Sequence, residues 1–301
     1  EYKRGVKAGY AKFETFPIWN LPLKHPVNLA YEAATADLND VNMIDPFHLE
    51  AYGVTTVNYN RDVEVFPVLR SIFEKLAGVS PYKSPTDMGV NMVGSCITDD
   101  GVVCAAARQE IIRRYYSVLC EQRQGLADAD MVYKVELLMN QAGVSTSDRP
   151  VIAPALKKAE ETGMPAASIQ LADGRIVTGK TSALLGASAA VLLNALKALG
   201  GIQHDIHLIS PIIIEPIQNL KTKHLGNHNP RLHTDEILVA LSICAATNPT
   251  AELAMRQLQK LRGCEAHSTV ILSHVDGDTF RKLGLNLTCE PQYQTKKLYH
   301  K

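Results

Sequence analysis

The segment Gly174–Thr181 constrains the fold of this chain more than any other. It reads G-R-I-V-T-G-K-T, which matches the phosphate-loop pattern G-x-x-x-x-G-K-[ST] at every position. A phosphate loop needs a buried strand that ends at the first glycine, followed by a flexible loop and a helix. Here Asp173-Gly174 is a strong two-residue hairpin signal, and residues 168–171 and 175–178 on either side of it are strand-like. We therefore predict a β-hairpin rather than a nucleotide-binding loop.

The balance of charge excludes several functions. Lysine plus arginine equals aspartate plus glutamate, at 31 each, so the chain lacks the basic excess that a dedicated nucleic-acid binder carries. The six cysteines form no C-x-x-C pair, which is typical of reduced thiols in a cytoplasm. The longest apolar stretch, residues 183–199, is interrupted by Asn194 and Lys197 and suits a core helix. We expect a cytoplasmic protein with neither a nucleic-acid nor a membrane partner.

The pattern of elements predicts a multidomain chain of the α/β and α+β classes. Residues 1–68 alternate short strands with a helix, as in the remainder of a Rossmann-like α/β domain. Residues 69–147 are mainly helical, and residues 148–301 form an α+β domain. Helices are expected at 28–38, 65–76, 101–122, 129–141, 157–161, 183–199, 235–246 and 249–262, and strands at 13–19, 41–44, 168–171, 175–178, 268–273 and 283–288.

Lys180, Thr181 and Ser182 stand where we expect the helix after the hairpin to begin. Free backbone N–H groups, the helix dipole and a lysine would attract an anion there. Alternatively, Thr181 or Ser182 simply caps the helix.

The densest polar cluster lies between His224 and His233, on a segment punctuated by Gly226 and Pro230. Loops on a rigid scaffold often carry function, so the cluster suits ligand or interface contacts; ordinary loop hydrogen bonding is the alternative. The histidine separations match no zinc signature, and we expect no metal site. The candidate ligand-binding residues here are His224, Asn227, His228, Arg231 and His233.

Two further pairs are weaker catalytic candidates. Glu265 and His267 would share one face of a strand and form an acid/base pair if that face opened on a pocket. Asp45 and His48 follow a short buried strand, where carboxylates of open α/β folds often face ligands. For Glu265 and His267 the alternative is a surface turn with Cys264 buried.

Long motifs of this chain closely resemble one bacterial family of uncharacterised proteins. It is called domain of unknown function eighteen-forty-six, or uncharacterised protein family zero-three-seven-one. Its members are longer, and the resemblance implies that this chain follows an N-terminal α/β half with a glycine-rich, P-loop-like segment. A nucleotide bound mainly by that half is the cofactor that the resemblance suggests. The motifs are residues 12–21, 25–37, 42–48 and 224–233.

The C-terminal domain is also loosely similar in topology to cytidine deaminases, in which a hairpin leads to T-G-[CH]-x-x-E at a helix start. Lys180 stands in place of the zinc ligand and Ala183 in place of the catalytic glutamate, so deaminase chemistry is not expected. No protease motif is present either.

Two functions stay open from the sequence. The first is a cytoplasmic enzyme of unknown reaction that acts on a small anionic or phosphorylated substrate, at a site shared with the N-terminal half of the family. The second is a non-catalytic module for homo-oligomerisation or ligand sensing, with the apolar helix 183–199 at the interface between copies.

Overall fold

The chain divides into two compact units, each with its own core. The computed structural model describes residues 4–5, 21–88 and 93–294. Unit 1 comprises residues 1–115 and 129–145, and unit 2 comprises residues 116–128 and 146–301. The boundary therefore falls inside one long helix. Among the described residues, no helix is long and apolar enough to cross a membrane.

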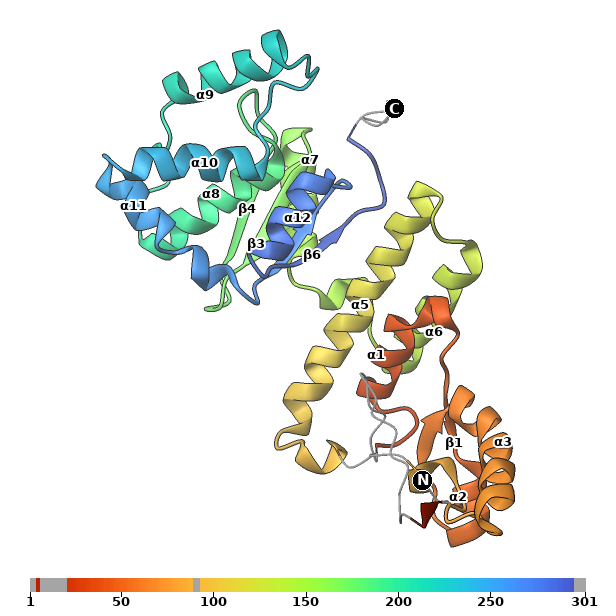
Figure 1. Cartoon of the computed structure of the whole chain (residues 1–301). Helices are drawn as coiled ribbons and strands as arrows, with labels where there is room; N and C mark the ends of the chain where they lie inside the picture. Colours follow the sequence, from red (N-terminus) through yellow and green to blue (C-terminus); the bar gives the residue numbers. More distant parts are fainter. Residues whose placement is uncertain (1–3, 6–20, 89–92, 295–301) are drawn as a thin grey trace. The chain divides into compact units, whose positions relative to one another are not determined.

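Unit 1 is mainly helical, with one small sheet (Figure 1). Strands β1 and β2 are antiparallel, and Met43 pairs with Asn58. Helix α6 packs against α1. The elements are α1 (Pro26–Ala34), β1 (Asn42–Ile44), α2 (Pro46–Tyr52), β2 (Val57–Tyr59), α3 (Asn60–Ala77), α4 (Pro85–Met88), α5 (Asp100–Gln124), whose last turns belong to unit 2, and α6 (Ala129–Ala142), with 3₁₀ turns at Ala36–Leu38 and Val93–Cys96.

Unit 2 contains a four-stranded sheet in the order β4-β3-β5-β6. The pairs β4–β3 and β3–β5 are antiparallel, whereas β5–β6 is parallel. The parallel pair requires a crossover, which α12 supplies. The elements are α7 (Ile152–Thr162), β3 (Ala166–Gln170), β4 (Ile176–Lys180), α8 (Ala187–Gly200), α9 (Pro211–Asn219), a π-helical turn (Leu220–His224), α10 (Thr234–Ala245), α11 (Pro249–Met255), α12 (His274–Lys282) and β6 (Asn286–Cys289), with β5 (Glu265–Ser268) before α12 and 3₁₀ turns at Thr146–Asp148 and Leu258–Leu261.

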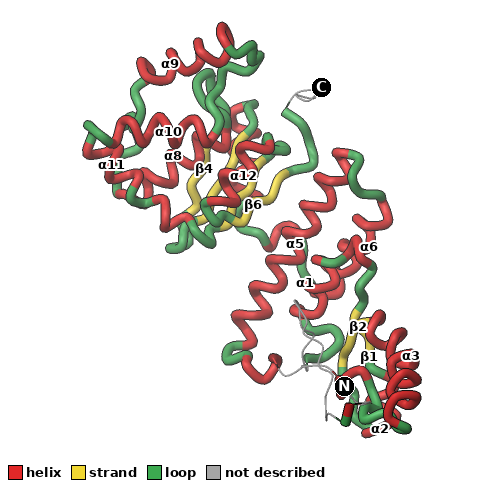
Figure 2. Tube along the Cα trace, viewed as in Figure 1, coloured by secondary structure: helices red, strands yellow, loops and turns green. Residues whose placement is uncertain are grey.

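The two faces of this sheet differ in polarity. Ala167, Ile169 and Ala266 are fully or almost fully buried against the apolar core that α8, α10 and α12 complete. Because side chains alternate along a strand, Ser168 and His267 point to the other face. There Ser168 Oγ donates to Val151 O, just before α7. Figure 2 shows the strands of unit 2 in yellow with helices around them. The sheet is thus the middle of three layers.

The segment with the phosphate-loop pattern is a hairpin, as predicted. Gly174 forms the turn with a φ of 84°, and the second glycine, Gly179, lies inside β4 opposite Ala167. A Cβ atom on Gly179 would lie 2.2 Å from Val191 N. Gly179 therefore lets α8 approach the sheet closely, and this packing accounts for the glycine without a phosphate ligand.

The prediction of a helix start at Lys180 is wrong. Lys180 ends β4, and α8 begins six residues after Thr181, at Ala187. The interval is a tight turn in which Ser182 N donates to Leu185 O at 2.9 Å. Small apolar residues continue through this turn into α8, which is why the pattern does not mark the boundary.

The structure confirms the mixture of helices and small sheets and corrects some elements. The strand expected at 268–273 lies earlier, at Glu265–Ser268, and the prediction omitted α2, β2, α9 and α12. The strand expected at 13–19 lies outside the described residues. The division of residues 1–147 into two domains stays a prediction.

The close approach of α8 at Gly179 is testable by a matched pair of substitutions. Gly179→Ala places a methyl group against backbone atoms, so we expect a loss of about 1–3 kcal/mol in the free energy of unfolding, as for other overpacked sites. Gly277→Ala in α12 meets no atom within 4 Å and needs no positive φ, so it is expected to be neutral or stabilising by up to about 1 kcal/mol. Denaturant unfolding of both variants measures the difference. Equal stability of the two variants would contradict the packing.

Candidate functional site

The carboxylate of Asp276 joins the starts of two helices in unit 2. Its Oδ1 accepts from the Thr234 backbone N–H and from Thr234 Oγ1, both at 2.9 Å. Its Oδ2 accepts from Ser273 Oγ at 2.9 Å and lies 3.0 Å from His233 Nδ1. Thr234 is the first residue of α10, and Ser273 is the N-cap of α12. A single buried carboxylate thus satisfies groups at both helix starts.

This contact orients the imidazole of His233. With Nδ1 bonded to Asp276, Nε2 has no hydrogen-bond partner among the residues that the structure describes. The His233 side chain is 30% exposed, whereas that of Asp276 is 9% exposed. A carboxylate that holds one imidazole nitrogen leaves the other available for proton transfer or for an anionic ligand.

The two groups shift each other's pKa in opposite directions. The hydrogen bond that His233 donates to Asp276 raises the pKa of His233 above its usual value, although burial opposes the rise. Burial alone would raise the pKa of Asp276, but hydrogen bonds from His233, Thr234 and Ser273 outweigh it and hold the pKa of Asp276 below its usual value. Both shifts favour an imidazolium–carboxylate pair near neutral pH.

A second ion pair holds the backbone of His233. The Glu236 carboxylate accepts from His233 N at 2.8 Å and from Lys221 Nζ at 2.6 Å. Lys221 is buried and also donates to Arg231 O at 2.7 Å. The ion pair of Lys221 and Glu236 thus fixes both ends of the loop. Removing either partner would leave the other charge without compensation.

The loop from Lys221 to His233 is docked onto the turn that follows the hairpin. Arg231 Nε donates to Ser182 O at 2.7 Å. Leu232 N donates to Leu184 O at 3.0 Å, and Gly186 N donates to Leu232 O at 3.4 Å. The structure therefore brings together the two segments that the sequence analysis singled out separately as ligand-binding.

Three helices start around this contact. Gly186 caps the start of α8 with no side-chain bond, and Leu232 next to it precedes the start of α10. Asp276 adds the start of α12. Each helix start carries partial positive charge, which the buried carboxylate balances only in part. The loop itself adds Lys221, Lys223 and Arg231 and contains no acidic residue.

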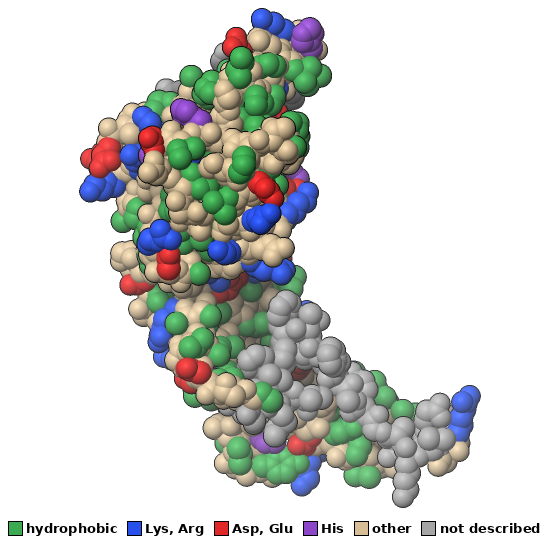
Figure 3. Space-filling view, turned by 90° about the vertical axis from the view of Figure 1, so that its left-hand side faces the viewer, with side chains coloured by type: hydrophobic (Ala, Val, Ile, Leu, Met, Phe, Trp, Pro, Cys, Tyr) green, Lys and Arg blue, Asp and Glu red, His purple; other side chains and the backbone are tan. Residues whose placement is uncertain are grey.

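The remaining candidates of these two segments take different positions. Lys180 and Ser182 are exposed, whereas Thr181 is buried with its N–H bonded to Pro165 O at 2.8 Å. Ser182 Oγ accepts from the backbone N–H groups of residues 184 and 185, so it caps a turn rather than a helix. His224, Asn227 and His228 have exposed side chains. Figure 3 shows basic, acidic and apolar side chains interspersed over the described part of the face that it presents.

Glu265 and His267 lie on one strand, β5, and belong to a buried polar network. Arg149, fully buried, donates to Glu265 Oε2 at 2.5 Å, to Thr288 Oγ1 at 2.9 Å and to the carbonyls of Ala266 and Asn286. His267 Nδ1 lies 2.9 Å from Thr288 Oγ1. This network joins the parallel strands β5 and β6 and accounts for both residues structurally.

Asp45 and His48 have structural partners in unit 1. Asp45 follows β1, as predicted, but its Oδ1 accepts from the N–H groups of Phe47 and His48 and caps α2. Its other oxygen accepts from Thr86 N and Thr86 Oγ1. His48 Nδ1 lies 2.9 Å from Ser84 Oγ. The sheet beside them is an antiparallel pair, which lacks the parallel strand ends on which their assignment depended.

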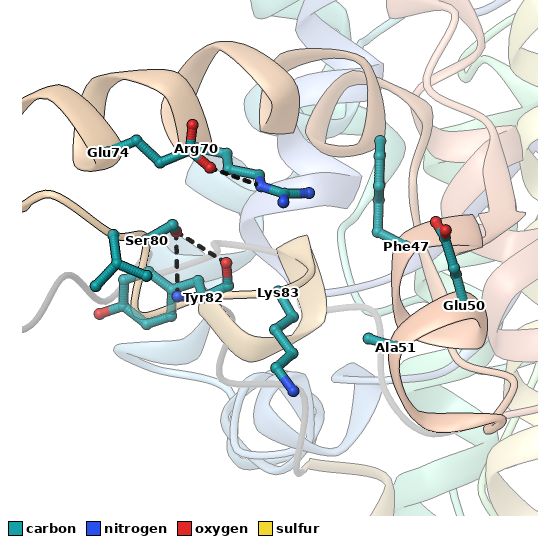
Figure 4. A pocket seen from close by; sticks show the side chains of 9 residues that line it. Phe47, Glu50, Ala51, Arg70, Glu74, Ser80, Tyr82 and Lys83 are labelled. Atoms are coloured by element: carbon teal, nitrogen blue, oxygen red, sulfur yellow. Dashed lines mark hydrogen bonds and ion pairs between the residues drawn. The ribbon is translucent and has the colours of Figure 1, made fainter.

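Unit 1 also contains an open hollow of about 370 Å³. Figure 4 shows Arg70 and Glu74 of α3 on one side, Glu50 of α2 on another and Lys83 on the loop after α3. Two basic and two acidic side chains line it, and Arg70 Nε lies 3.1 Å from Glu74 Oε1. The walls therefore favour no ligand charge, and the hollow holds none of the residues that the sequence singled out.

Asp276, Ser273 and Thr234 join the candidate site, and the sequence analysis did not single them out as ligand-binding or catalytic residues. The segment S-H-V-D from Ser273 to Asp276 is a helix-start signature of the [ST]-x-x-[DE] type. The strand that the sequence predicts at residues 268–273 includes Ser273, so the prediction places no helix start there.

Comparison with known proteins identifies the family. The N-terminal model of the family "Domain of unknown function DUF1846" matches residues 1–143, and its C-terminal model matches residues 147–299. The chain belongs to this family. DUF1846 relatives include a UPF0371 protein of Corynebacterium urealyticum, 60% identical over 301 residues, and one of Corynebacterium efficiens, 61% identical over 301 residues. In both, the match covers 100% of this chain and 61% of the relative. A UPF0371 protein of Streptococcus pyogenes is 60% identical over 297 residues, or 99% of this chain and 60% of the relative. The chain thus spans about three fifths of the length of these relatives.

The ion pair of His233 is testable by its titration. Because the pKa of folded His233 lies above the usual value of about 6.5, the stabilisation from the pair is complete below that pH and is lost as the pH rises through the folded pKa. Asp276→Asn removes the charge that raises this pKa. We expect NMR of the histidine ring to show His233 titrating above about 6.5 in the wild type and at a lower pH in the variant.

Asp278→Asn is the matched control, because Asp278 lies on the same helix but pairs with His274 and Arg281. It is expected to leave the titration of His233 unchanged. A His233 pKa that does not respond to Asp276→Asn would show that the contact does not govern the imidazole.

Proposed function

We propose that unit 2 binds a small anionic or phosphorylated ligand at the starts of α8, α10 and α12, and that His233 transfers a proton there. The observation that carries the proposal is the His233–Asp276 pair, whose imidazole keeps one nitrogen free of partners within the described residues. The contact with Asp276 raises the pKa of His233 and so favours the imidazolium. An imidazolium next to helix starts is suited to an anion and to donating a proton to it.

The surrounding charges support an anion rather than a cation. Lys221 is neutralised by Glu236, but Lys223 and Arg231 carry charge on the same loop without an acidic residue between them. Within the part of the chain that the structure describes, the Arg231 side chain donates a hydrogen bond through Nε alone, so its other guanidinium nitrogens can bind a phosphate or carboxylate. Lys180, exposed at the end of β4, is a further cation on the neighbouring segment.

The scaffold supports the same location. A hairpin, β3–β4, leads into α8, and we propose that this arrangement is loosely that of the cytidine-deaminase topology. In that topology the reacting groups stand at the helix start after the hairpin, which here is the start of α8. The zinc ligand and the catalytic glutamate of that family have no counterparts at Lys180 and Ala183, so the likeness concerns only where a ligand binds.

The whole protein is, on this proposal, a cytoplasmic enzyme. Since the chain spans 61% of the length of its relatives, a nucleotide cofactor and part of the substrate site are proposed to lie on the segment of those relatives that this chain does not cover.

Homo-oligomerisation without catalysis is the second proposed function, on a surface other than the helix 183–199 expected from the sequence. Leu192, Ala195 and Leu196 of α8 are fully buried in the core of unit 2, so this helix does not provide the interface expected from the sequence. Val239 and Ile243, one turn apart on α10, are 60% and 64% exposed. A charged residue at both positions would abolish an assembly that they hold together, and the solution mass would report the loss.

Ligand binding is testable on the full chain by thermal unfolding with inorganic phosphate, sugar phosphates and nucleotides at pH 7. A ligand at ten times its Kd stabilises the folded state by about 1.4 kcal/mol and raises the melting temperature by a few degrees. We expect His233→Gln and Arg231→Gln each to raise the apparent Kd of the ligand at least tenfold. Each variant then needs at least ten times more ligand for the same stabilisation.

Lys260→Gln is the control, because Lys260 is an exposed cation of unit 2 on a different element. It is expected to keep the wild-type response. If no anion stabilises the protein, or if Lys260→Gln weakens binding as much as Arg231→Gln does, the proposed site is wrong.

A further inference from the structure

Three side chains of unit 1 that bind metals well converge on one point. His25 is the N-cap residue of α1, while Asp100 and Cys104 lie four residues apart in the first turns of α5. Positions i and i+4 of a helix lie on one face, so both side chains reach the same spot. His25 Nε2 lies 2.9 Å from Asp100 Oδ1 and 3.5 Å from Cys104 Sγ, and Cys104 Sγ lies 3.5 Å from Asp100 Oδ2.

Two of these three separations match the spacing of ligands around a tetrahedral ion, with His25 and Cys104 contacting different oxygens of the Asp100 carboxylate. With bonds of about 2.0 Å to nitrogen or oxygen and about 2.3 Å to sulfur, tetrahedral ligands stand about 3.3–3.5 Å apart. Both contacts of Cys104 already have this spacing. The contact between His25 and Asp100 is shorter and needs to open by only a few tenths of an ångström.

The arrangement does not suit a nucleophilic cysteine. In a Cys–His–Asp triad the imidazole joins thiol and carboxylate through its two different nitrogens. Here both Cys104 and Asp100 contact the same nitrogen, Nε2 of His25, and Nδ1 instead accepts from Val27 N at 3.3 Å. Burial and the Asp100 carboxylate also raise the pKa of the Cys104 thiol, the reverse of what activation requires.

We propose that His25, Asp100 and Cys104 bind a divalent transition-metal ion of the Zn²⁺ class, with one coordination position left open. One nitrogen, one thiolate sulfur and one carboxylate oxygen suit Zn²⁺ and exclude Mg²⁺ and Ca²⁺, which take oxygen ligands. The thiolate and carboxylate charges balance the ion, and Arg108, one turn after Cys104, donates through Nε to Ala142 O at 3.4 Å. Metal binding at Nε2 places the imidazole proton on Nδ1, which ends the long bond from Val27.

The exposure of the three side chains suits a metal ion that is held by buried ligands and enters from solvent. Cys104 is buried and the His25 side chain is only 10% exposed, whereas that of Asp100 is 65% exposed. An ion can therefore enter from the Asp100 side, where a water would complete the tetrahedron. The sequence pattern did not indicate this site, because 75 residues separate His25 from Asp100.

The test is binding of Zn²⁺ and Co²⁺ to the reduced full chain. We expect one Zn²⁺ per chain by equilibrium dialysis, no binding of Mg²⁺, and for Co²⁺ the visible absorption of a tetrahedral site together with a thiolate charge-transfer band. His25→Gln, Asp100→Asn and Cys104→Ser should each lower the affinity at least tenfold, and Cys104→Ser should abolish the charge-transfer band.

Cys96→Ser and His274→Gln are matched controls, because Cys96 and His274 are both exposed. Circular dichroism checks that each variant is folded. Asp100→Asn is expected to fold normally, because the Asp100 side chain is largely in solvent. Absence of stoichiometric Zn²⁺ binding, or binding that the three ligand variants leave unchanged, overturns the proposal. In that outcome the cluster is a hydrogen-bonded tie between α1 and α5.

Discussion

The organisation of unit 2 around its candidate site depends on the buried carboxylate of Asp276. Two helix starts, those of α10 and α12, would otherwise leave polar groups unsatisfied in the same small volume. One acidic side chain satisfies both and fixes the imidazole of His233 with one nitrogen inward. The positive ends of the helices and the imidazolium stabilise the carboxylate, so removal of any partner leaves the others with an uncompensated charge or an unmade bond. The contact that holds the helices together thus also binds Nδ1 of His233 and fixes the orientation of its ring.

The two faces of the sheet in unit 2 are held by different interactions. On one face, glycine at position 179 lets α8 lie against the strands and complete an apolar core. On the other, Arg149 donates to side chains and carbonyls of both β5 and β6. Glu265 and His267 belong to that buried network, and this explains why residues with catalytic chemistry lie on a central strand. The proposed site lies instead where loops meet helix starts, and there the side chain of His233 is 30% exposed.

Much of unit 2 was predictable from the sequence because its signals are local. Asp173-Gly174 marks a turn whose geometry needs a glycine, and Asn248-Pro249 marks a helix start that the structure contains. The residue types of the His224–His233 cluster single it out in the sequence. Its contact with Ser182 depends on the fold, because Arg231 and Ser182 are separated by 49 positions in the chain. The sequence does not single out Asp276, because α12 is short and mostly polar and therefore gives little periodic signal. The convergence of His25 with Asp100 and Cys104 likewise arises from tertiary packing, which no spacing rule reports.

The central claim is that His233 Nε2 faces an anion-binding site, and phosphate titration followed by ¹⁵N NMR of the histidine rings tests it most directly. The account predicts that inorganic phosphate shifts the Nε2 resonance of His233 saturably, and more than its Nδ1 resonance, because Nδ1 is bonded to Asp276. His274, exposed on α12, should show only the small linear change of a surface histidine. A His233 ring that does not respond to phosphate, or responds no more than His274 does, would contradict the account.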